Sequence, residues 1–494
     1  MGNPFQPLPD KEFDYLAAQH LLNRAGFGGT PSQVRALQAL GLDDAVDYLV
    51  DFKGERVAND GFEFKSDILR EQTPEERETL RRARATGDAE TIARIERERQ
   101  MRQNADRAQI AEMKRWWLAR MIETGRPLQE KLTLFWHGHF ATGYRTIENS
   151  WHMLMQNGML RSNCAGGFAT LARGIISDPA MLKYLDNDEN RKASPNENLA
   201  RELLELFTLG EGNGYSERDI KEGARALTGR TFRGNEFFFD RSQHDGGGKQ
   251  ILRRSGNFGG DDFVSIILEQ PACSRFIAWK LYRFFVSDAP TVTRDGAETI
   301  ERLAKALREA RSELRPALRA LFRSQHFYAL ENRQAIVKSP TQLIVQTVRG
   351  LGTPARSVDR LVEAGDLMGQ ELFQPPSVKG WPGGRSWINT ATMFTRQNTA
   401  VFLITGRSTR GPASGADEPY DAMQLVEHLR GAGGALDPRE CIRSVAAFAL
   451  GAEPGPARVA ELEDYLDGLG GRIDNDRMKA LLCLITAMPE YQLC

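Results

Sequence analysis

Residues 194–229 read SPNENLARELLELFTLGEGNGYSERDIKEGARALTG, and their pattern decides the fold class. Apolar residues recur at helical spacing in the first half, with Leu203, Leu204 and Phe207 on one side of the helix. A Gly-rich turn and a second capped helix follow. The segment therefore predicts two amphipathic helices joined by a turn.

The first of these helices opens with a predicted capping box. Ser194 and Glu197 have the S-x-x-E spacing in which each side chain satisfies a backbone N–H of the first turn, and Pro195 suits that turn. This role in capping is sufficient to explain Glu197. We therefore expect the helix to begin directly after Ser194.

The polar side of this helix has two possible interpretations. Asn198, Arg201, Glu202 and Glu205 lie there, and charges four residues apart can pair as they do on an ordinary solvated helix. The alternative is that the same side chains form the wall of a site. That alternative predicts that Arg201, Glu202 and Glu205 face the histidines described below.

Helical patterns dominate the rest of the chain, and no strand alternation is sufficient for a large sheet. We therefore expect a mainly α protein, a large multi-helix assembly with irregular Gly/Pro/Trp-rich loops and little or no sheet. Residues 1–407 are predicted to form the main domain, with a charged helical arm at 73–113 that breaks near Gly87. A linker at 408–419 and a helical subdomain at 420–494 follow.

The overall composition excludes several classes of protein. The 494 residues carry a net charge of −1, without the basic excess typical of a nucleic-acid binder. No apolar run reaches the roughly 18 residues that a membrane helix needs. The five cysteines form no CxxC pair, which favours reduced thiols. With no secretory signal visible, we expect a cytoplasmic protein that binds neither nucleic acid nor membrane.

Two short motifs contain candidate metal ligands. FWHGHFAT places His137 and His139 on either side of Gly138, which we expect to end the preceding helix so that both rings can converge. His244 and Asp245 lie in a Gly-rich segment that brings backbone close to a ligand. Such a set suits a divalent transition metal, namely zinc, manganese or iron. Packing and turn roles for these residues are the alternative.

A late loop, PPSVKGWPGGRSWIN, interleaves aromatic, basic and amide residues. Tryptophan faces can stack on a ligand while the basic and amide groups bind its oxygens, although the loop can equally be a plug that buries its tryptophans. The predicted substrate-binding residues are Lys379, Trp381, Trp387, Asn389, Asn198 and Lys249.

Several motifs together resemble the bacterial domain-of-unknown-function family numbered 1800. They are HLLNRAGFGGTP, FWHGHFAT, DPAMLKYLD, NENLARELLELFTLGEGNGYSERDIKEGARALTGR, HDGGGK, VKSP with Arg349, and GQELFQPPSVKGWPGGRSWIN with Arg396, which span most of the chain. The resemblance implies a large, mainly helical protein, often encoded beside a partner of a sulfatase-like or phosphatase-like family. Many members are exported, and many carry His where this chain has Phe207. The resemblance supplies no reaction.

Two hypotheses follow. The first is a metal-assisted enzyme with one polar cleft, with His137, His139, His244 and Asp245 as ligands, Glu202 or Glu205 as general base and Arg201 as anchor of an anionic substrate. Hydrolysis is the first expectation for its reaction and a metal-dependent oxidation the second. The other hypothesis is a non-catalytic helical scaffold whose contact element is the charged arm.

Overall fold

Helices supply almost all of the regular structure, as the sequence predicts. The structure, a computed structural model, describes residues 4–56, 62–408, 415, 417–430 and 437–494. Within these residues, 24 α-helices are joined by loops and 3₁₀ turns, and the strands form two small two-stranded sheets. The mainly α class is therefore confirmed.

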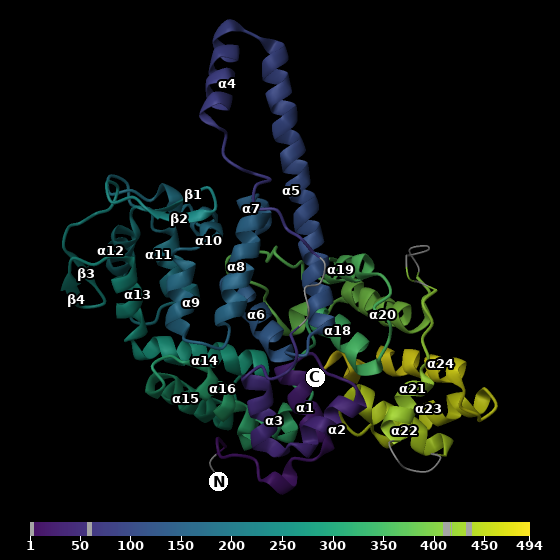
Figure 1. The fold of residues 1–494 in the computed structure, drawn as a ribbon. Coiled ribbons are helices and arrows are strands. Elements are labelled where there is room, and N and C mark those ends of the chain that lie inside the picture. Colours follow the sequence, from purple (N-terminus) through teal and green to yellow (C-terminus); the bar gives the residue numbers. More distant parts are fainter. Residues whose placement is uncertain (1–3, 57–61, 409–414, 416, 431–436) are drawn as a thin grey trace.

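Three short helices form the base of the molecule in Figure 1. They are α1 (Tyr15–Ala25), α2 (Pro31–Ala39) and α3 (Gly41–Val50). The 3₁₀ turn η1 (Asp10–Glu12) precedes α1. Thr30 caps α2 through a reciprocal capping box with Gln33, because a Thr-Pro start presents its hydroxyl to the third backbone N–H of the helix. These helices bury most of their apolar residues in the common core.

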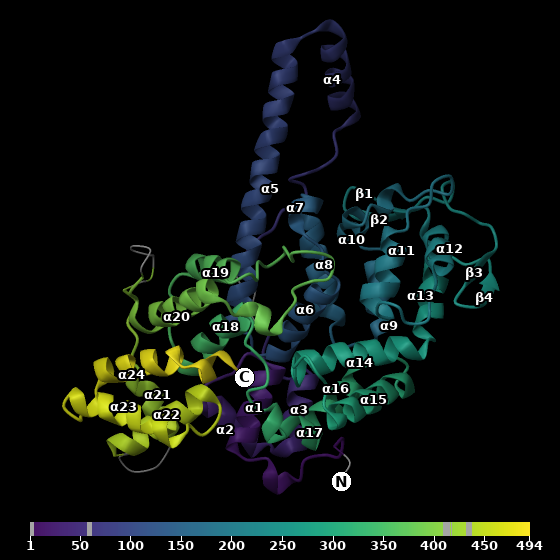
Figure 2. The same cartoon turned by 180° about the vertical axis from the view of Figure 1, so that it is seen from behind.

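A helical hairpin projects from the body (Figures 1 and 2). It consists of α4 (Pro74–Thr86) and the first half of α5 (Ala89–Glu123), and Gly87 reverses the chain with a φ of +72°. At 1.5 Å per residue α5 is about 50 Å long. Its buried residues begin only at Asp106, so residues 73–105, called the arm below, stand free of the body. The predicted break near Gly87 is confirmed.

Five helices form the centre of the molecule, and α6 is buried along most of its length. They are α6 (Pro127–His139), α7 (Tyr144–Ile147), α8 (Ser150–Asn163), α9 (Phe168–Ile175) and α10 (Pro179–Tyr184). The prediction that Gly138 ends α6 is wrong, since the helix continues to His139. Gly138 instead leaves room for a neighbouring tryptophan: a Cβ there would lie 3.3 Å from the ring of Trp381.

Residues 194–229 form two helices, but the first begins later than predicted. The elements here are η2 (Asn187–Glu189), α11 (Asn198–Glu202), the π-helical turn η3 (Leu203–Thr208) and α12 (Glu217–Leu227). Ser194 lies in a turn that bridges to Arg191, and no side chain caps α11, so the predicted capping box is wrong. Glu197 is instead paired with Arg201, 3.0 Å away.

Two β-hairpins and five further helices flank the centre on one side (Figure 1). Strands β1 (Arg230–Arg233) and β2 (Glu236–Phe239) pair antiparallel, as do β3 (Lys249–Ile251) and β4 (Arg254–Gly256). The helices are α13 (Gly260–Leu268), α14 (Pro271–Phe285), α15 (Arg294–Glu309), α16 (Leu314–Arg323) and α17 (Gln325–Tyr328), followed by η4 (Leu330–Asn332).

The remaining helices lie on the opposite side and pack on the main body. They are α18 (Pro340–Leu351), α19 (Val358–Leu367), α20 (Thr390–Thr405), α21 (Met423–Arg430), α22 (Pro438–Leu450), α23 (Pro456–Gly468) and α24 (Asn475–Ala487), with η5 (Gly384–Trp387) and η6 (Pro489–Gln492). A backbone bridge joins Val337 to Leu493, and Gln19 Nε2 donates to the Phe448 carbonyl over 2.7 Å. Most of the linker predicted at residues 408–419 lies outside the described residues.

Neither a membrane-spanning helix nor a disulfide bond is found among the described residues. Among the described residues, no helix combines the length and the apolar character that crossing a membrane requires. The five cysteines are all unpaired, and four of them are buried.

Candidate functional site

The late tryptophan loop packs directly on the end of α6 that carries the two histidines. Gly380 has a φ of +78°, and a Cβ at this position would lie 2.0 Å from the Gly138 carbonyl oxygen. Only a glycine permits this approach. The ring of Trp381 stacks at a tilt on His137, with 5.5 Å between the ring centroids. Two motifs far apart in sequence therefore meet at one place.

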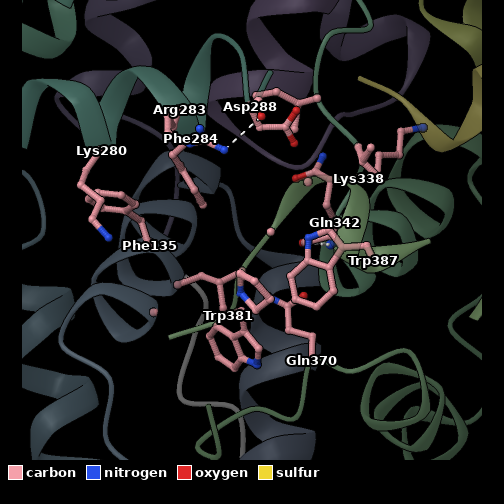
Figure 3. Close-up of a pocket in the computed structure, with 18 of the residues that line it drawn as sticks. Phe135, Lys280, Arg283, Phe284, Asp288, Lys338, Gln342, Gln370, Trp381 and Trp387 are labelled. Atoms are coloured by element: carbon pink, nitrogen blue, oxygen red, sulfur yellow. Dashed lines mark hydrogen bonds between the residues drawn. The ribbon is translucent and has the colours of Figure 1, made fainter. Parts of the chain in front are cut away.

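A pocket of ≈ 380 Å³ lies beside this junction. Three tryptophans line it, Trp279 from α14 and Trp381 and Trp387 from the loop, and we call it the tryptophan pocket. Figure 3 shows Trp381 and Trp387 together, with Lys280 and Lys338 at opposite sides of the view. The predicted substrate residues Lys379, Trp381 and Trp387 therefore line one pocket, together with His139.

Positive charge surrounds the tryptophan pocket. Its cationic lining residues are Arg24, Lys131, Lys280, Arg283, Lys338 and Lys379, and its acidic groups are Asp288 and Cys494. Three of the cations are almost fully enclosed, because Arg24 is 2% exposed, Lys131 7% and Lys338 1%. None of these three forms an ion pair with any residue that the structure describes.

Neutral groups provide the hydrogen bonds of these buried cations. Arg24 donates to the carbonyls of Phe285, Val286 and Asn332. Lys131 donates to the Gln342 amide oxygen, and Lys338 donates to the Tyr491 carbonyl over 2.8 Å. These side chains therefore have hydrogen-bond partners, while the acidic groups Cys494 and Asp288 act on their charge without forming an ion pair among the described residues.

Burial disturbs the titration of the pocket residues. Desolvation lowers the pKa of Lys131 to about 8 and that of Lys338 to about 8, against a smaller upward influence of Cys494. The pKa of Lys280 is also lowered by burial and by the neighbouring Arg283. Burial also raises the pKa of Asp288, although the nearby Arg24 and Arg283 act against this. Burial in this pocket therefore disfavours the charged forms of its lysines.

The two histidines of FWHGHFAT point to different partners. His137 Nε2 accepts the backbone N–H of Phe373 over 3.2 Å, so the neutral ring carries its proton on Nδ1. His139 Nε2 lies 2.9 Å from the Phe207 carbonyl, which can only accept, so this ring carries its proton on Nε2. Desolvation lowers the pKa of each to about 3, so both are neutral at pH 7.

The Phe207 carbonyl is available to His139 because it lies in the last turn of the helix that ends at Thr208, where carbonyls have no intrahelical donor. His139 Nδ1 is buried and has no hydrogen-bond partner among the described residues, as is also true of Arg24 Nε and Trp381 Nε1. The pocket residues thus retain unused polar atoms.

The predicted catalytic residues lie beside the pocket rather than in its lining. Arg201 pairs with Glu197, Glu205 and Glu217, so its guanidinium is occupied by neighbours on α11 to α12. Burial, with a contribution from Glu205, raises the pKa of Glu202, and Lys379 acts against this. The connection of this helix to His139 runs through the Phe207 backbone and not through its carboxylates.

The second candidate motif is a local structural unit. His244 Nδ1 lies 2.9 Å from the Thr228 carbonyl, and Asp245 pairs with Arg225 over 2.7 Å, which lowers the pKa of Asp245 to about 2. Lys249 donates to two carbonyls of its own loop. These contacts hold the Gly-rich segment against α12.

Two of the predicted substrate-binding residues, Asn389 and Asn198, form local hydrogen bonds, and the predicted metal ligands are not grouped among the described residues. Asn389 caps α20 by accepting the Thr392 N–H, and the Asn198 N–H bonds to the Asn196 side chain. Among the described residues, no three His, Cys, Asp or Glu side chains are grouped so that they could hold a metal ion. A metal ion bound by His137, His139, His244 and Asp245 stays a prediction.

The comparison with protein families agrees with the resemblance in the motifs. The family model described as "Protein of unknown function (DUF1800)" matches residues 20–493. This chain belongs to the DUF1800 family. No curated protein and no solved structure matches it. The family match includes the arm and the C-terminal helices, which the quoted motifs leave largely uncovered.

Sequence reasoning missed most of the cations in this DUF1800 pocket. Lys131 lies in the apolar helix PLQEKLTLFWHGHF, where a lysine among buried residues is a detectable signal. Lys280 and Trp279 are adjacent in a helix whose pattern indicates only a core. Lys338 precedes the capping residue of α18, and nothing in its local pattern indicates burial.

Proposed function

We propose that this DUF1800 protein is an enzyme that binds an anionic small molecule in the tryptophan pocket. The observation that carries the proposal is the set of three enclosed cations, Arg24, Lys131 and Lys338, without an ion pair among the described residues. Burying a charge without a counter-charge is expensive, and a bound anion would compensate it. The N-terminus of α18, capped by Ser339 at the pocket wall, adds favourable dipoles.

The aromatic walls favour an organic anion over a simple inorganic one. Trp279, Trp381 and Trp387 offer ring faces, and Gln342 and Gln370 add amide groups to the lining. Lysines whose pKa is lowered toward neutrality can also exchange protons with a substrate, which supports Lys131 and Lys338 as acid–base groups. Hydrolysis is the reaction class that we propose, and metal-dependent oxidation is the alternative.

Calorimetric titration with benzoate and with benzyl alcohol tests the binding step. The two probes share a ring and differ in charge, so the account expects benzoate to bind at pH 7 and benzyl alcohol to bind at least about tenfold more weakly, a difference of about 1.4 kcal/mol. Lys338→Met should weaken the binding of benzoate, and Lys192→Met, at an exposed position, is its control. Equal binding of the two probes would remove the basis of the proposal.

The arm supports a second function, contact with a partner protein. Residues 73–105 stand free, and Met101 is 62% exposed on this otherwise charged hairpin. The partner of a sulfatase-like or phosphatase-like family remains a prediction, as does the cytoplasmic location. Replacement of residues 74–104 by a short Gly/Ser link should leave benzoate affinity unchanged. A parallel loss of benzoate affinity would show that the arm belongs to the pocket instead.

A further inference from the structure

A second pocket adjoins the tryptophan pocket. It has a volume of ≈ 480 Å³, and Trp279 lines both pockets. The walls of the second pocket come mainly from apolar side chains of α14, of α15 and of the segment between them, namely Ala272, Phe276, Val292, Ala297 and Ile300. We call it the apolar pocket. Unlike the tryptophan pocket, it has no buried lysine in its lining.

An exposed ion pair and a partly buried lysine lie between the two pockets. Glu211 lines the apolar pocket and pairs over 2.7 Å with Lys379, which lines the tryptophan pocket. The Lys379 side chain is 67% exposed and that of Glu211 61%, so the pair contributes little stability. A ligand can therefore displace it at low cost. Lys280 lies over the ring faces of Phe276 and Trp279, at 5.4 Å and 5.8 Å from their centroids.

Lys280 therefore stands at the boundary of a cationic pocket and an apolar one. It has no ion pair among the described residues, and its charge faces two aromatic rings and the neighbouring Arg283. A carboxylate beside Lys280 would place any attached apolar group against Phe276 and Trp279. The charge pattern of the two pockets thus matches a molecule with one acidic end and one apolar end.

We propose that the ligand is an amphiphilic acid whose anionic head lies in the tryptophan pocket and whose apolar chain or ring fills the apolar pocket. This inference rests on the proposed function, because the head uses the same cations. It adds the substrate class, since an acid without an apolar part would leave the apolar pocket unused. Apolar burial then contributes most of the affinity, and the cations select the charge.

Chain length provides the direct test, with butyrate, decanoate and decanol as probes for calorimetry on the full protein. Each methylene buried raises affinity about fourfold, so decanoate should bind at least about 100-fold more tightly than butyrate. Decanol, which lacks the charge, should bind more weakly than decanoate. Decanoate affinity equal to that of butyrate would overturn the inference and leave the proposed function standing. Failure of both acids would overturn both.

A filled apolar pocket gives the second arm of the test. Ala297 is exposed in the first half of α15 and lines the apolar pocket, so Ala297→Phe should occupy it without disturbing the core. Ala85→Phe adds the same ring at an exposed helical position of the arm and is the matched control. We expect Ala297→Phe to reduce decanoate affinity to the level of butyrate and to leave butyrate unchanged. Unchanged decanoate affinity in Ala297→Phe would contradict the placement of the chain.

Discussion

Gly380 and Gly138 are in such close contact that a Cβ on Gly380 would lie 2.0 Å from the Gly138 carbonyl oxygen. The contact joins the tryptophan loop to the end of α6. It fixes Trp381 against His137 and gives the tryptophan pocket one of its walls. The proposed site depends on this approach of two backbones.

Gly380→Ala should therefore destabilise the protein and weaken benzoate binding. Gly212→Ala is the matched control, because Gly212 has a similar φ of +74° but no atom within 4 Å of its Cβ position. Both variants lose about 1–2 kcal/mol through the left-handed backbone. Only Gly380→Ala adds a collision, which costs about 1–3 kcal/mol more in urea unfolding. Equal losses would show that the loop moves freely away from α6.

Glu130 is expected to be the most sensitive carboxylate of the centre. It is fully buried and accepts from Arg120, Arg161 and Trp117, and although burial alone would raise its pKa, the two arginines lower it. Glu130→Ala should reduce the free energy of unfolding by about 3–5 kcal/mol, because it leaves two guanidinium groups without their partner. Glu78→Ala on the arm breaks two exposed pairs, with Arg81 and Arg82, and should change the free energy of unfolding by about 1 kcal/mol or less.

The buried histidines predict a loss of stability in acid. The pKa of His139 is about 3 in the folded protein, below the usual 6.5, so its neutral form contributes stability above pH 6.5 that is lost as the pH falls toward 3. His139→Gln keeps an N–H donor for the Phe207 carbonyl but does not titrate. Between pH 6 and pH 4, the free energy of unfolding of this variant should fall less steeply than that of the wild type. The two slopes should differ by about 1.4 kcal/mol per pH unit. His428→Gln, at an exposed position, should keep the wild-type slope.

The buried lysines predict a gain of stability in alkali. The pKa of Lys131 is lowered to about 8 in the folded protein, so its charge opposes folding below pH 8 and this opposition fades as the pH rises to the unfolded value of 10.5. Without ligand, Lys131→Met should thus be more stable than the wild type at pH 7, with the difference shrinking by pH 10. Urea unfolding at both pH values measures this. A less stable variant at pH 7 would show that the hydrogen bond to Gln342 outweighs the burial of charge.

The mainly α fold and the helical arm follow from the sequence. Helical period, Pro–Gly punctuation and charge pairing are local signals, and they locate the break at Gly87. The start of α11 and the continuation of α6 through Gly138 were missed, because packing by Trp381 and an alternative turn at Ser194 override local preference. Lys338 and Lys280 were missed because burial of a charge depends on distant helices.

Binding of an organic anion by the pocket cations is measured by titration calorimetry with benzoate at pH 7 and pH 9.5, on the wild type and on Lys280→Met. Lys280 forms no ion pair among the described residues, so this variant should keep the wild-type fold, which circular dichroism verifies. The account predicts binding at pH 7 that weakens about tenfold or more at pH 9.5, where Lys131 and Lys338 lose their charge, and that weakens similarly in Lys280→Met. Absence of binding at pH 7, or binding that is the same at both pH values and in both proteins, would contradict it.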